Sequence, residues 1–414
     1  MDWDSLISKL YGLRRFGIEP GLTTMQEALR RENSPQEGYR VITVAGTNGK
    51  GTVASMTAAL LQAKGKSVGL YTSPHLIDVT ERFRVNGEPL ARDVVAPVMS
   101  RLLREYGRRQ KRSGAVEGLT FFELTTLTAA VLFANCDVDV AVFEVGLGGR
   151  LDAVNAIEPD VTAVTTIARD HEEYLGTKLG AIAGEKAGIF RPGVPAVIGG
   201  QENDEAYRVL VTAAQKLGSP VVDTDDGSDD KADGAPFERR HRGTAVAVAE
   251  AALGAELPQS VMEEGFRRWR WPGRFEELQL EEDGRVLLVD AAHNPAGLRA
   301  LKGAWIARRD EIGAVIWASM NDKDVSGIRE FLEAINAPVW GSLVANDRAL
   351  GTDELREVVP SKLWRGAMAI EEALAEVKRD TSGAILVFGS IYLLGEVMEA
   401  IGLSSSQLRT YVLH

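Results

Sequence analysis

Short apolar runs alternate with helical patterns along most of this sequence, and this alternation restricts the fold more than any other feature. In the first half of the chain, the apolar runs with the length of strands are 41–45, 67–71, 138–145, 161–167 and 194–198. The stretches with helical patterns between them are 52–64, 122–134 and 179–187. Strands separated by helices are typical of βαβ units, in which neighbouring strands run parallel. The sequence therefore predicts an α/β domain built on a parallel sheet.

A second alternating series begins after residue 282. It opens with an apolar run over 286–290 and ends with a run over 384–388, followed by a final helix. The charged, glycine-containing stretch 222–234 is expected to be an exposed loop. At 414 residues, the chain is long enough for two domains that each have a core of their own. We place the predicted domains at 1–282 and 283–414.

The balance of charges restricts the partners that we expect. With 47 basic and 59 acidic residues, the net charge is -12 at pH 7, which argues against nucleic acid or a membrane surface as a partner. The most apolar long stretch, 125–145, is interrupted by polar and acidic residues, so we expect no membrane span. The single cysteine, Cys136, cannot form an internal disulfide, and residues 1–4 lack the basic start of a signal peptide. We therefore expect a cytoplasmic protein.

A glycine-rich loop joins the first predicted strand to the first long helical pattern. Its sequence is Ala45-Gly46-Thr47-Asn48-Gly49-Lys50-Gly51-Thr52. Glycines permit a tight turn in which successive N–H groups and the start of a helix face an anion, while Lys50 adds a charge and Thr52 a hydroxyl for Mg²⁺. Gly51 separates Lys50 from Thr52, so the spacing differs from that of the standard phosphate-binding loop. We predict a phosphate-binding site, and the alternative is a glycine-rich turn without a ligand.

A carboxylate ends another predicted strand. Glu144 lies at the end of the apolar run over 138–145, and ligands of parallel α/β folds bind at the carboxyl edge of the sheet. Glu144 is therefore a candidate metal ligand. The glycines that follow it, Gly146, Gly148 and Gly149, do not have the spacing of a dinucleotide-binding loop.

Histidines provide further candidates. Of the five in the chain, His75, His171 and His293 lie in predicted loops beside strand ends. Mg²⁺ prefers oxygen ligands, and the predicted ligand set is Thr52, Ser73, Glu144 and His171, together with nucleotide phosphates. The alternative for His171 is a hydrogen-bonded loop histidine without a metal. Polar residues also follow an apolar strand over 289–295, where the alternative to a site is a capped turn, and 271–274 taken alone is a plain interdomain linker.

Taken together, these segments resemble the Mur-ligase superfamily and, within it, the folylpolyglutamate synthase/dihydrofolate synthase family. The matching segments are 46–52, 73–76, 120–123, 144–152, 170–171, 185–189, 272–274, 290–295, 322–324 and 388–390. The resemblance implies a central P-loop ATPase domain of the Mur-ligase type with a parallel sheet, a smaller Rossmann-like C-terminal domain, and ATP held between them. It also implies a ligase that uses ATP to activate the carboxylate of a folate or of dihydropteroate as an acyl phosphate, which the amine of L-glutamate then attacks.

The resemblance assigns expected roles to single residues. The expected ATP contacts are Gly46, Thr47, Asn48, Gly49, Lys50, Gly51 and Thr52 in the first domain, and Arg274, Asp290 and His293 from the linker and second domain. The residues expected to take part in catalysis are Lys50, Lys186 and His171. Lys186 is expected to carry a carbamate, which replaces its positive charge by a negative one. The expected substrate-binding residues are Thr120, Phe121, Phe122 and Glu123 on the pterin side, and Arg150.

Several positions depart from the family pattern, two of them where ligand contacts are expected, and two other functions stay open. Thr23-Thr24 follows Gly21-Leu22, where the family has an arginine two residues on, and the asparagine expected before the helix at 245–253 is Thr244 or Ala245. The first alternative is a Mur-type ligase that joins another amino acid to a different carboxylate. The second is a nucleotide-driven switch that forms no amide product. We expect a monomer in each case.

Overall fold

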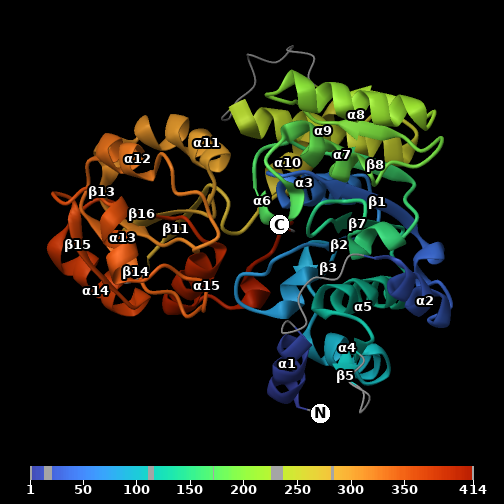
Figure 1. Cartoon of the computed structure of the whole chain (residues 1–414), viewed down its shortest axis with the longest axis horizontal. Coiled ribbons are helices and arrows are strands. Elements are labelled where there is room, and N and C mark those ends of the chain that lie inside the picture. Colours follow the sequence, from blue (N-terminus) through green and yellow to red (C-terminus); the bar gives the residue numbers. More distant parts are fainter. Residues whose placement is uncertain are drawn as a thin grey trace. The chain divides into compact units, whose positions relative to one another are not determined.

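The computed structural model of the chain describes residues 2–13, 21–110, 116–170, 172–224, 236–280 and 284–412. The chain forms two compact units (Figure 1). Unit 1 comprises Met1–Ser73, Val79–Arg270 and Arg409–His414, and unit 2 comprises Pro74–Asp78 and Trp271–Leu408. A two-domain α/β architecture was predicted and is confirmed, although each unit is assembled from more than one segment of the chain.

The structure places the main boundary between Arg270 and Trp271, earlier than the predicted position at residue 282. The difference arises from strand β11 (Glu276–Gln279), which pairs antiparallel with β12 (Val286–Asp290) and so belongs to the second sheet. Its Glu-Glu-Leu-Gln sequence alternates half-buried and exposed residues. An edge strand with a single apolar residue gives no strand signal in the sequence.

Unit 1 is built on an eight-stranded sheet in which most neighbours are parallel. The strand order is β10-β9-β8-β1-β7-β2-β3-β4, and only β3 and β4 run antiparallel to their neighbours. The strands are β1 (Arg40–Ala45), β2 (Val68–Tyr71), β3 (Phe83–Val85), β4 (Glu88–Pro89), β7 (Val140–Glu144), β8 (Val161–Val164), β9 (Ala196–Ile198) and β10 (Val221–Asp223). In a separate two-stranded sheet, β5 (Arg109–Gln110) pairs antiparallel with β6 (Val116–Glu117). The central strands β1 and β7 are rich in valine and almost entirely buried, as parallel strands covered on both faces are.

Helices cover both faces of this sheet (Figure 1). They are α1 (Trp3–Gly12), α2 (Thr23–Arg31), α3 (Lys50–Ala63), α4 (Arg92–Tyr106), α5 (Phe121–Asn135), α6 (Glu172–Leu175), α7 (Leu179–Ala187), α8 (Asp204–Lys216), α9 (Pro236–Leu253) and α10 (Gln259–Arg268). Helix α3 packs against α9 and α10, while α5 packs against α4. No helix of the described ranges is both long enough and apolar enough to cross a membrane.

Helices α3 and α5 are buried on all sides, which explains their composition. Residues 53–61 of α3 and 123–133 of α5 are buried without interruption. A helix without a solvent face has no use for charged residues. The threonines of α5 satisfy their hydroxyls locally, because Thr126 and Thr128 donate to the carbonyl oxygens of Phe122 and Leu124, respectively.

A late segment of the chain returns to unit 1 after unit 2 is complete. The N–H of Thr410 donates to the carbonyl oxygen of Gly87 (2.9 Å), and the N–H of Arg270 donates to that of Thr410 (2.9 Å). Thr410 and Tyr411 are both buried. Besides the short excursion of Pro74–Asp78, the chain therefore passes from unit 1 to unit 2 at Arg270–Trp271 and returns at Leu408–Arg409.

Unit 2 is a smaller sheet with helices on both faces, as the predicted Rossmann-like domain requires. Its strand order is β11-β12-β16-β13-β14-β15, and all pairs except β11–β12 are parallel. The remaining strands are β13 (Ile312–Trp317), β14 (Val339–Ser342), β15 (Trp364–Met368) and β16 (Ala384–Phe388). The helices are α11 (Pro295–Ile306), α12 (Ile328–Ile335), α13 (Thr352–Val358), α14 (Ile370–Asp380) and α15 (Ile391–Ala400).

Two apolar cores lie on opposite faces of the unit 2 sheet. Leu287 and Val289 of β12 join the core that contains α14 and α15, whereas Leu288 of the same strand joins the core that contains α11 and α12. This division follows from the alternation of side chains along a strand. The apolar run over 286–290 is thus buried on both faces, which is why it gave a clear strand signal.

Candidate active site

The glycine-rich loop connects β1 directly to α3, as the sequence predicted. Gly46 follows the last residue of β1 with φ 146°, and Gly49 is the N-cap of α3 with φ 80°. Both values lie in the region that favours glycine. Because Gly49 has no side chain, it cannot cap the helix, and the N–H groups of the first turn are left to an anion. Lys50, Gly51 and Thr52 form this first turn.

The loop is clamped by the segment that follows β8. The N–H of Thr47 donates to the carbonyl oxygen of Thr166 (2.9 Å), and the Thr47 hydroxyl both donates to the carbonyl oxygen of Ala168 and accepts from its N–H. The Thr165 hydroxyl donates to the carbonyl oxygen of Asn48 (2.7 Å). A Cβ atom on Gly46 would lie 3.0 Å from the Cβ atom of Thr165 and closer still to its hydroxyl oxygen. Glycine at position 46 is therefore needed for close approach as well as for backbone conformation.

Two lysines meet at this loop. The Nζ atom of Lys50 donates to the carbonyl oxygen of Thr47 (3.2 Å), and that of Lys186 donates to the carbonyl oxygen of Gly46 (2.7 Å). Burial and then the charge of Lys50 lower the pKa of Lys186 to about 7, against the opposing effect of Asp170 and Asp152. A substantial fraction of Lys186 is therefore a neutral amine near pH 7, which is the form that can react as a nucleophile.

Ser73 and Glu144 lie together at the carboxyl edge of the sheet. Strands β2 and β7 are parallel neighbours, so the residues that follow them are adjacent. The N–H of Ser73 donates to Oε2 of Glu144 (2.9 Å), and the Glu144 side chain is buried. Thr52 lies on the first turn of α3, and His171 lies outside the described residues. The structure thus brings together the Ser73 and Glu144 of the predicted metal-ligand set.

The chemistry of these side chains fits Mg²⁺. Two hydroxyls and one carboxylate supply oxygen ligands, and a magnesium site in an ATPase is usually completed by phosphate oxygens and water. Among the described residues, no group of three or more His, Cys, Asp and Glu side chains is placed to hold a metal by itself. A metal at Glu144 therefore depends on nucleotide phosphates to complete its coordination.

The loop after Glu144 contains a buried carboxylate that was not among the predicted site residues. Asp152 accepts hydrogen bonds from the N–H groups of Leu147 (2.9 Å) and Val154 (3.0 Å). Burial raises the pKa of Asp152 to about 6, against the opposing effect of these donors and of the Lys50 charge. Asp152 therefore fixes the shape of this loop and supplies a negative charge near the two lysines. The sequence offered one signal, because Asp152 ends the glycine-rich segment that follows Glu144.

Arg150 is placed beside the lysine-bearing helix. Its guanidinium forms an ion pair with Glu185 (2.9 Å), the residue that precedes Lys186. A Cβ atom on Gly149 would lie 2.7 Å from the carbonyl oxygen of Glu185 and 2.9 Å from Cα of Lys186. The absence of a side chain at position 149 thus lets the loop pack onto the end of α7. The expected role of Arg150 in substrate binding stays a prediction.

The four residues expected on the pterin side divide into two kinds. Thr120 is the N-cap of α5 and forms a capping box with Glu123, whose Oε2 accepts from the N–H (2.8 Å) and the hydroxyl (2.7 Å) of Thr120. This pair has a structural role at the start of the helix. The rings of Phe121 and Phe122 are only half-buried, and the guanidinium of Arg82 lies 5.2 Å from the centre of the Phe121 ring. Substrate binding by these four residues stays a prediction.

In unit 2, Asp290 joins the segment that follows Trp271 to the end of β12. Its two carboxylate oxygens accept from the N–H groups of Phe275 (2.8 Å) and Ala292 (2.7 Å). Burial raises the pKa of Asp290, against the opposing effect of Arg274. His293 Nδ1 lies 2.9 Å from the carbonyl oxygen of Ala291. The structure thus brings Arg274, Asp290 and His293 together within unit 2, and their expected contacts with ATP stay predictions.

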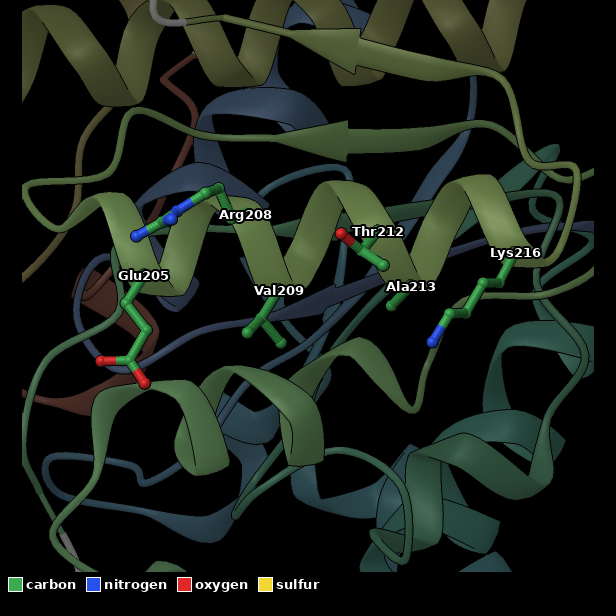
Figure 2. Close-up of a pocket in the computed structure, with 6 residues that line it drawn as sticks. All are labelled: Glu205, Arg208, Val209, Thr212, Ala213 and Lys216. Atoms are coloured by element: carbon green, nitrogen blue, oxygen red, sulfur yellow. The ribbon is translucent and has the colours of Figure 1, made fainter.

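Two hollows on the surface of unit 1 lie outside this set of residues. The first has a volume of about 500 Å³ and is lined by α8 (Figure 2). Its lining residues are Glu205, Arg208, Val209, Thr212, Ala213 and Lys216. The second has a volume of about 430 Å³ and is lined by α2, the end of α4 and residues 117–119. Neither contains a residue that the sequence analysis assigned to the site.

The fold and the site define a phosphate-loop ligase of the Mur type, and comparisons with known proteins agree. Residues 44–259 match the family model described as "Mur ligase middle domain". The dihydrofolate synthase/folylpolyglutamate synthase of Escherichia coli is 32% identical over 418 residues, which cover 96% of this chain and 95% of that protein. The chain belongs to the folylpolyglutamate synthase/dihydrofolate synthase family, and the resemblance found in the sequence is confirmed.

Two further comparisons extend this result. A probable bifunctional folylpolyglutamate synthase/dihydropteroate synthase of Haloferax volcanii is 30% identical over 437 residues, but this chain spans only 50% of its length. A crystal structure of a bifunctional folylpolyglutamate synthase/dihydrofolate synthase with Mn, AMPPNP and L-glutamate bound superposes with a TM-score of 0.81. Its sequence is 29% identical, and the match covers 96% of this chain and 98% of that one.

Proposed function

We propose that this protein uses ATP to join L-glutamate to the carboxylate of a folate, of dihydropteroate, or of both. The observation that carries the proposal is that Lys50 and Lys186 both bond to the phosphate loop, while the Glu144–Ser73 pair lies at the end of β7, the parallel neighbour of the strand from which the loop starts. Family membership selects glutamate ligation among the reactions that a phosphate loop can serve. The similarity to known folylpolyglutamate and dihydrofolate synthases favours this function over that of a ligase for another amino acid and over that of a nucleotide-driven switch.

The reaction proceeds in two displacements. An oxygen of the acceptor carboxylate attacks the γ-phosphorus of ATP, the bond to the β–γ bridging oxygen breaks, and ADP leaves. The amine nitrogen of glutamate then attacks the acyl carbon of the resulting acyl phosphate, and inorganic phosphate leaves as the nitrogen loses a proton. The first step brings two anions together, so positive charge at the loop is needed to lower its barrier.

Lys50 and the N–H groups at the start of α3 supply that stabilisation. The ammonium group of Lys50 is held beside the loop by its hydrogen bond to Thr47, so it is oriented before the substrate arrives. Preorganised donors stabilise developing charge without the cost of reorganisation during the reaction. Gly46, Asn48 and Gly49 contribute by shaping the backbone that carries the N–H groups.

Thr52, Ser73 and Glu144 would hold Mg²⁺, with His171 as the fourth expected ligand. When bound, the ion neutralises phosphate charge and so permits the approach of a carboxylate. The hydrogen bond from the Ser73 N–H orients the Glu144 carboxylate, and the burial of Glu144 keeps competing water away from it.

Lys186 is suited to carry a carbamate. Carbamate formation requires a neutral amine, which attacks the carbon of carbon dioxide and loses a proton. The lowered pKa of about 7 supplies that neutral amine near pH 7. A carbamate at this position would place a negative charge beside the loop, where a second divalent cation can balance it.

A comparison of acceptors tests the proposal. Dihydropteroate and tetrahydrofolate are each offered with ATP, Mg²⁺ and L-glutamate, and release of ADP and phosphate is followed together with the mass of the product. We expect glutamate-dependent turnover with at least one acceptor and an amide product. Turnover with neither pterin acceptor would refute the proposal, while the ratio of the two rates assigns one or both activities.

A further inference from the structure

The imidazole of His241 lies against the phosphate loop, although nothing in the sequence pattern singled it out. His241 belongs to α9, and its ring contacts Gly49. A Cβ atom built on Gly49 would lie 2.7 Å from Cε1 and 2.9 Å from Cδ2 of this ring, and closer still to Nε2. The Nε2 edge of the imidazole therefore fills the space that a side chain at position 49 would occupy.

Gly49 is a position where such a contact matters. As the N-cap of α3, with φ 80°, it sets the direction in which the chain enters the helix. The N–H groups that follow it are those that point toward an anion at a helix start. A side chain that packs against Gly49 therefore helps to fix the orientation of the N–H groups that would bind the triphosphate.

The other contacts of the loop act on earlier residues. Thr165 packs against Gly46 and bonds the carbonyl oxygen of Asn48, while Lys186 bonds the carbonyl oxygen of Gly46. His241 acts at the opposite end of the loop, where it joins the helix. Thr165 and Lys186 thus hold the start of the loop, and His241 holds its end.

The position of the His241 ring is set by the packing of α9, without any need for a ligand. Ala245 and Val248 of α9 are fully buried, and the Thr57 hydroxyl of α3 donates to the carbonyl oxygen of Ala245 (3.5 Å). The neighbouring residue Arg242 is directed elsewhere, because its guanidinium pairs with Glu238 (2.8 Å) and lies 4.8 Å from the centre of the Phe266 ring.

The ring is uncharged in this environment. Burial, and then the positive charge of Arg240, lower the pKa of His241 to about 4. The imidazole therefore packs against Gly49 as a neutral group at pH 7, and it contributes through its shape.

We propose that His241 is a positioning residue for ATP, which fixes the start of α3 by filling the space beside Gly49. The inference rests on the proposed function, because it takes the loop to bind nucleotide and uses L-glutamate as the comparison substrate. It implies that changes at position 241 alter nucleotide affinity while leaving the affinity for L-glutamate unchanged.

Three substitutions at one position test this inference. His241→Ala empties the space, His241→Gln places its terminal amide near the position of Nε2, and His241→Asn reaches only as far as Nδ1. Binding of ADP with Mg²⁺ is measured by calorimetry. We expect His241→Ala and His241→Asn to weaken ADP binding about tenfold, and His241→Gln to stay within about threefold of the unaltered chain.

A matched control and a second readout separate positioning from general damage. Arg242→Ala removes the adjacent side chain of the same helix, and we expect unchanged ADP binding. In steady-state assays, His241→Ala should raise the KM for ATP and leave the KM for glutamate unchanged. Circular dichroism monitors folding. If His241→Ala fails to fold, the comparison of His241→Gln with His241→Asn still tests whether filling the space beside Gly49 determines ADP affinity.

A double-mutant cycle tests the contact directly. Gly49→Ala should weaken ADP binding, since its Cβ atom collides with His241 and its backbone is strained at positive φ. Adding His241→Ala removes the collision, so the double variant should bind ADP more tightly than the sum of the two single effects predicts. Additive effects, or equal ADP binding in all position 241 variants, would overturn the inference. Failure of the unaltered chain to bind ADP would overturn the proposed function as well.

Discussion

Lys186→Met exchanges a buried amine for an apolar side chain of similar length, and the consequence for stability depends on pH. In the folded chain the pKa of Lys186 is about 7, against 10.5 for an ordinary lysine. Between these two values, the unfolded chain holds a proton that the folded chain lacks. Stability rises with pH wherever the unfolded state binds more protons. Lys186 therefore makes the folded chain more stable as the pH increases from 7 toward 10.5.

The size of this effect follows from the two pKa values. One pKa unit corresponds to about 1.4 kcal/mol, and integration over the proton-binding difference gives a gain of about 2 kcal/mol between pH 7 and pH 9. Lys186→Met has no amine and should lack this gain. It also loses the hydrogen bond to the carbonyl oxygen of Gly46, but that loss lowers the stability by a similar amount at both pH values and largely cancels in the comparison.

The assay is urea unfolding followed by far-ultraviolet circular dichroism, at pH 7 and pH 9, in buffer free of carbon dioxide. For each protein we measure the change in unfolding free energy between pH 7 and pH 9, and we then compare the two changes. Titrating groups that do not interact with Lys186 contribute equally to both proteins and cancel in this comparison. We expect a difference of about 2 kcal/mol. Parallel pH dependences within about 0.5 kcal/mol would refute the assignment of a lowered pKa to Lys186.

Three substitutions test the phosphate site itself. Lys50→Ala should reduce kcat/KM about a hundredfold or more in the glutamate-dependent release of ADP, because it removes a charge that stabilises the transferring phosphoryl group; a loss of less than tenfold would contradict this role. Glu144→Gln keeps an acceptor for the Ser73 N–H but removes the negative charge of the carboxylate. The Mg²⁺ concentration for half-maximal activity should therefore rise about tenfold, and an unchanged Mg²⁺ concentration would exclude Glu144 as a ligand. Gly46→Ala collides with Thr165, so ADP binding measured by calorimetry should weaken about tenfold, whereas normal affinity would show that the loop adapts.

The parts of the site that the sequence predicted are those with a local signal. The glycine-rich loop follows an apolar strand and opens a helix, so its strand, turn and helix were all indicated within 41–64. Glu144 was predicted because it ends a buried strand. The capping box of Thr120 and Glu123 also has a local signal, a threonine followed three residues later by a glutamate. That pattern alone would have indicated the structural role of this pair.

Contacts between distant segments could not be predicted in this way. His241 meets Gly49 because α9 packs on α3, and no periodicity in either helix specifies which side chains face each other across that interface. The same holds for the return of Thr410 to Gly87, which places the last segment of the chain in unit 1. Hydrophobic patterns fix the faces of single elements, whereas the pairing of elements depends on the whole fold.

The glycines around the phosphate loop show why these distant contacts matter for function. Gly46 is required by Thr165, Gly49 by His241, and Gly149 by the end of the helix that carries Lys186. In each case the missing side chain admits a group from another element, so these glycines serve packing, whatever part they take in binding a nucleotide. The loops at this edge of the sheet therefore form one packed block, and a substitution at any of these glycines should change nucleotide affinity through the neighbour that it displaces.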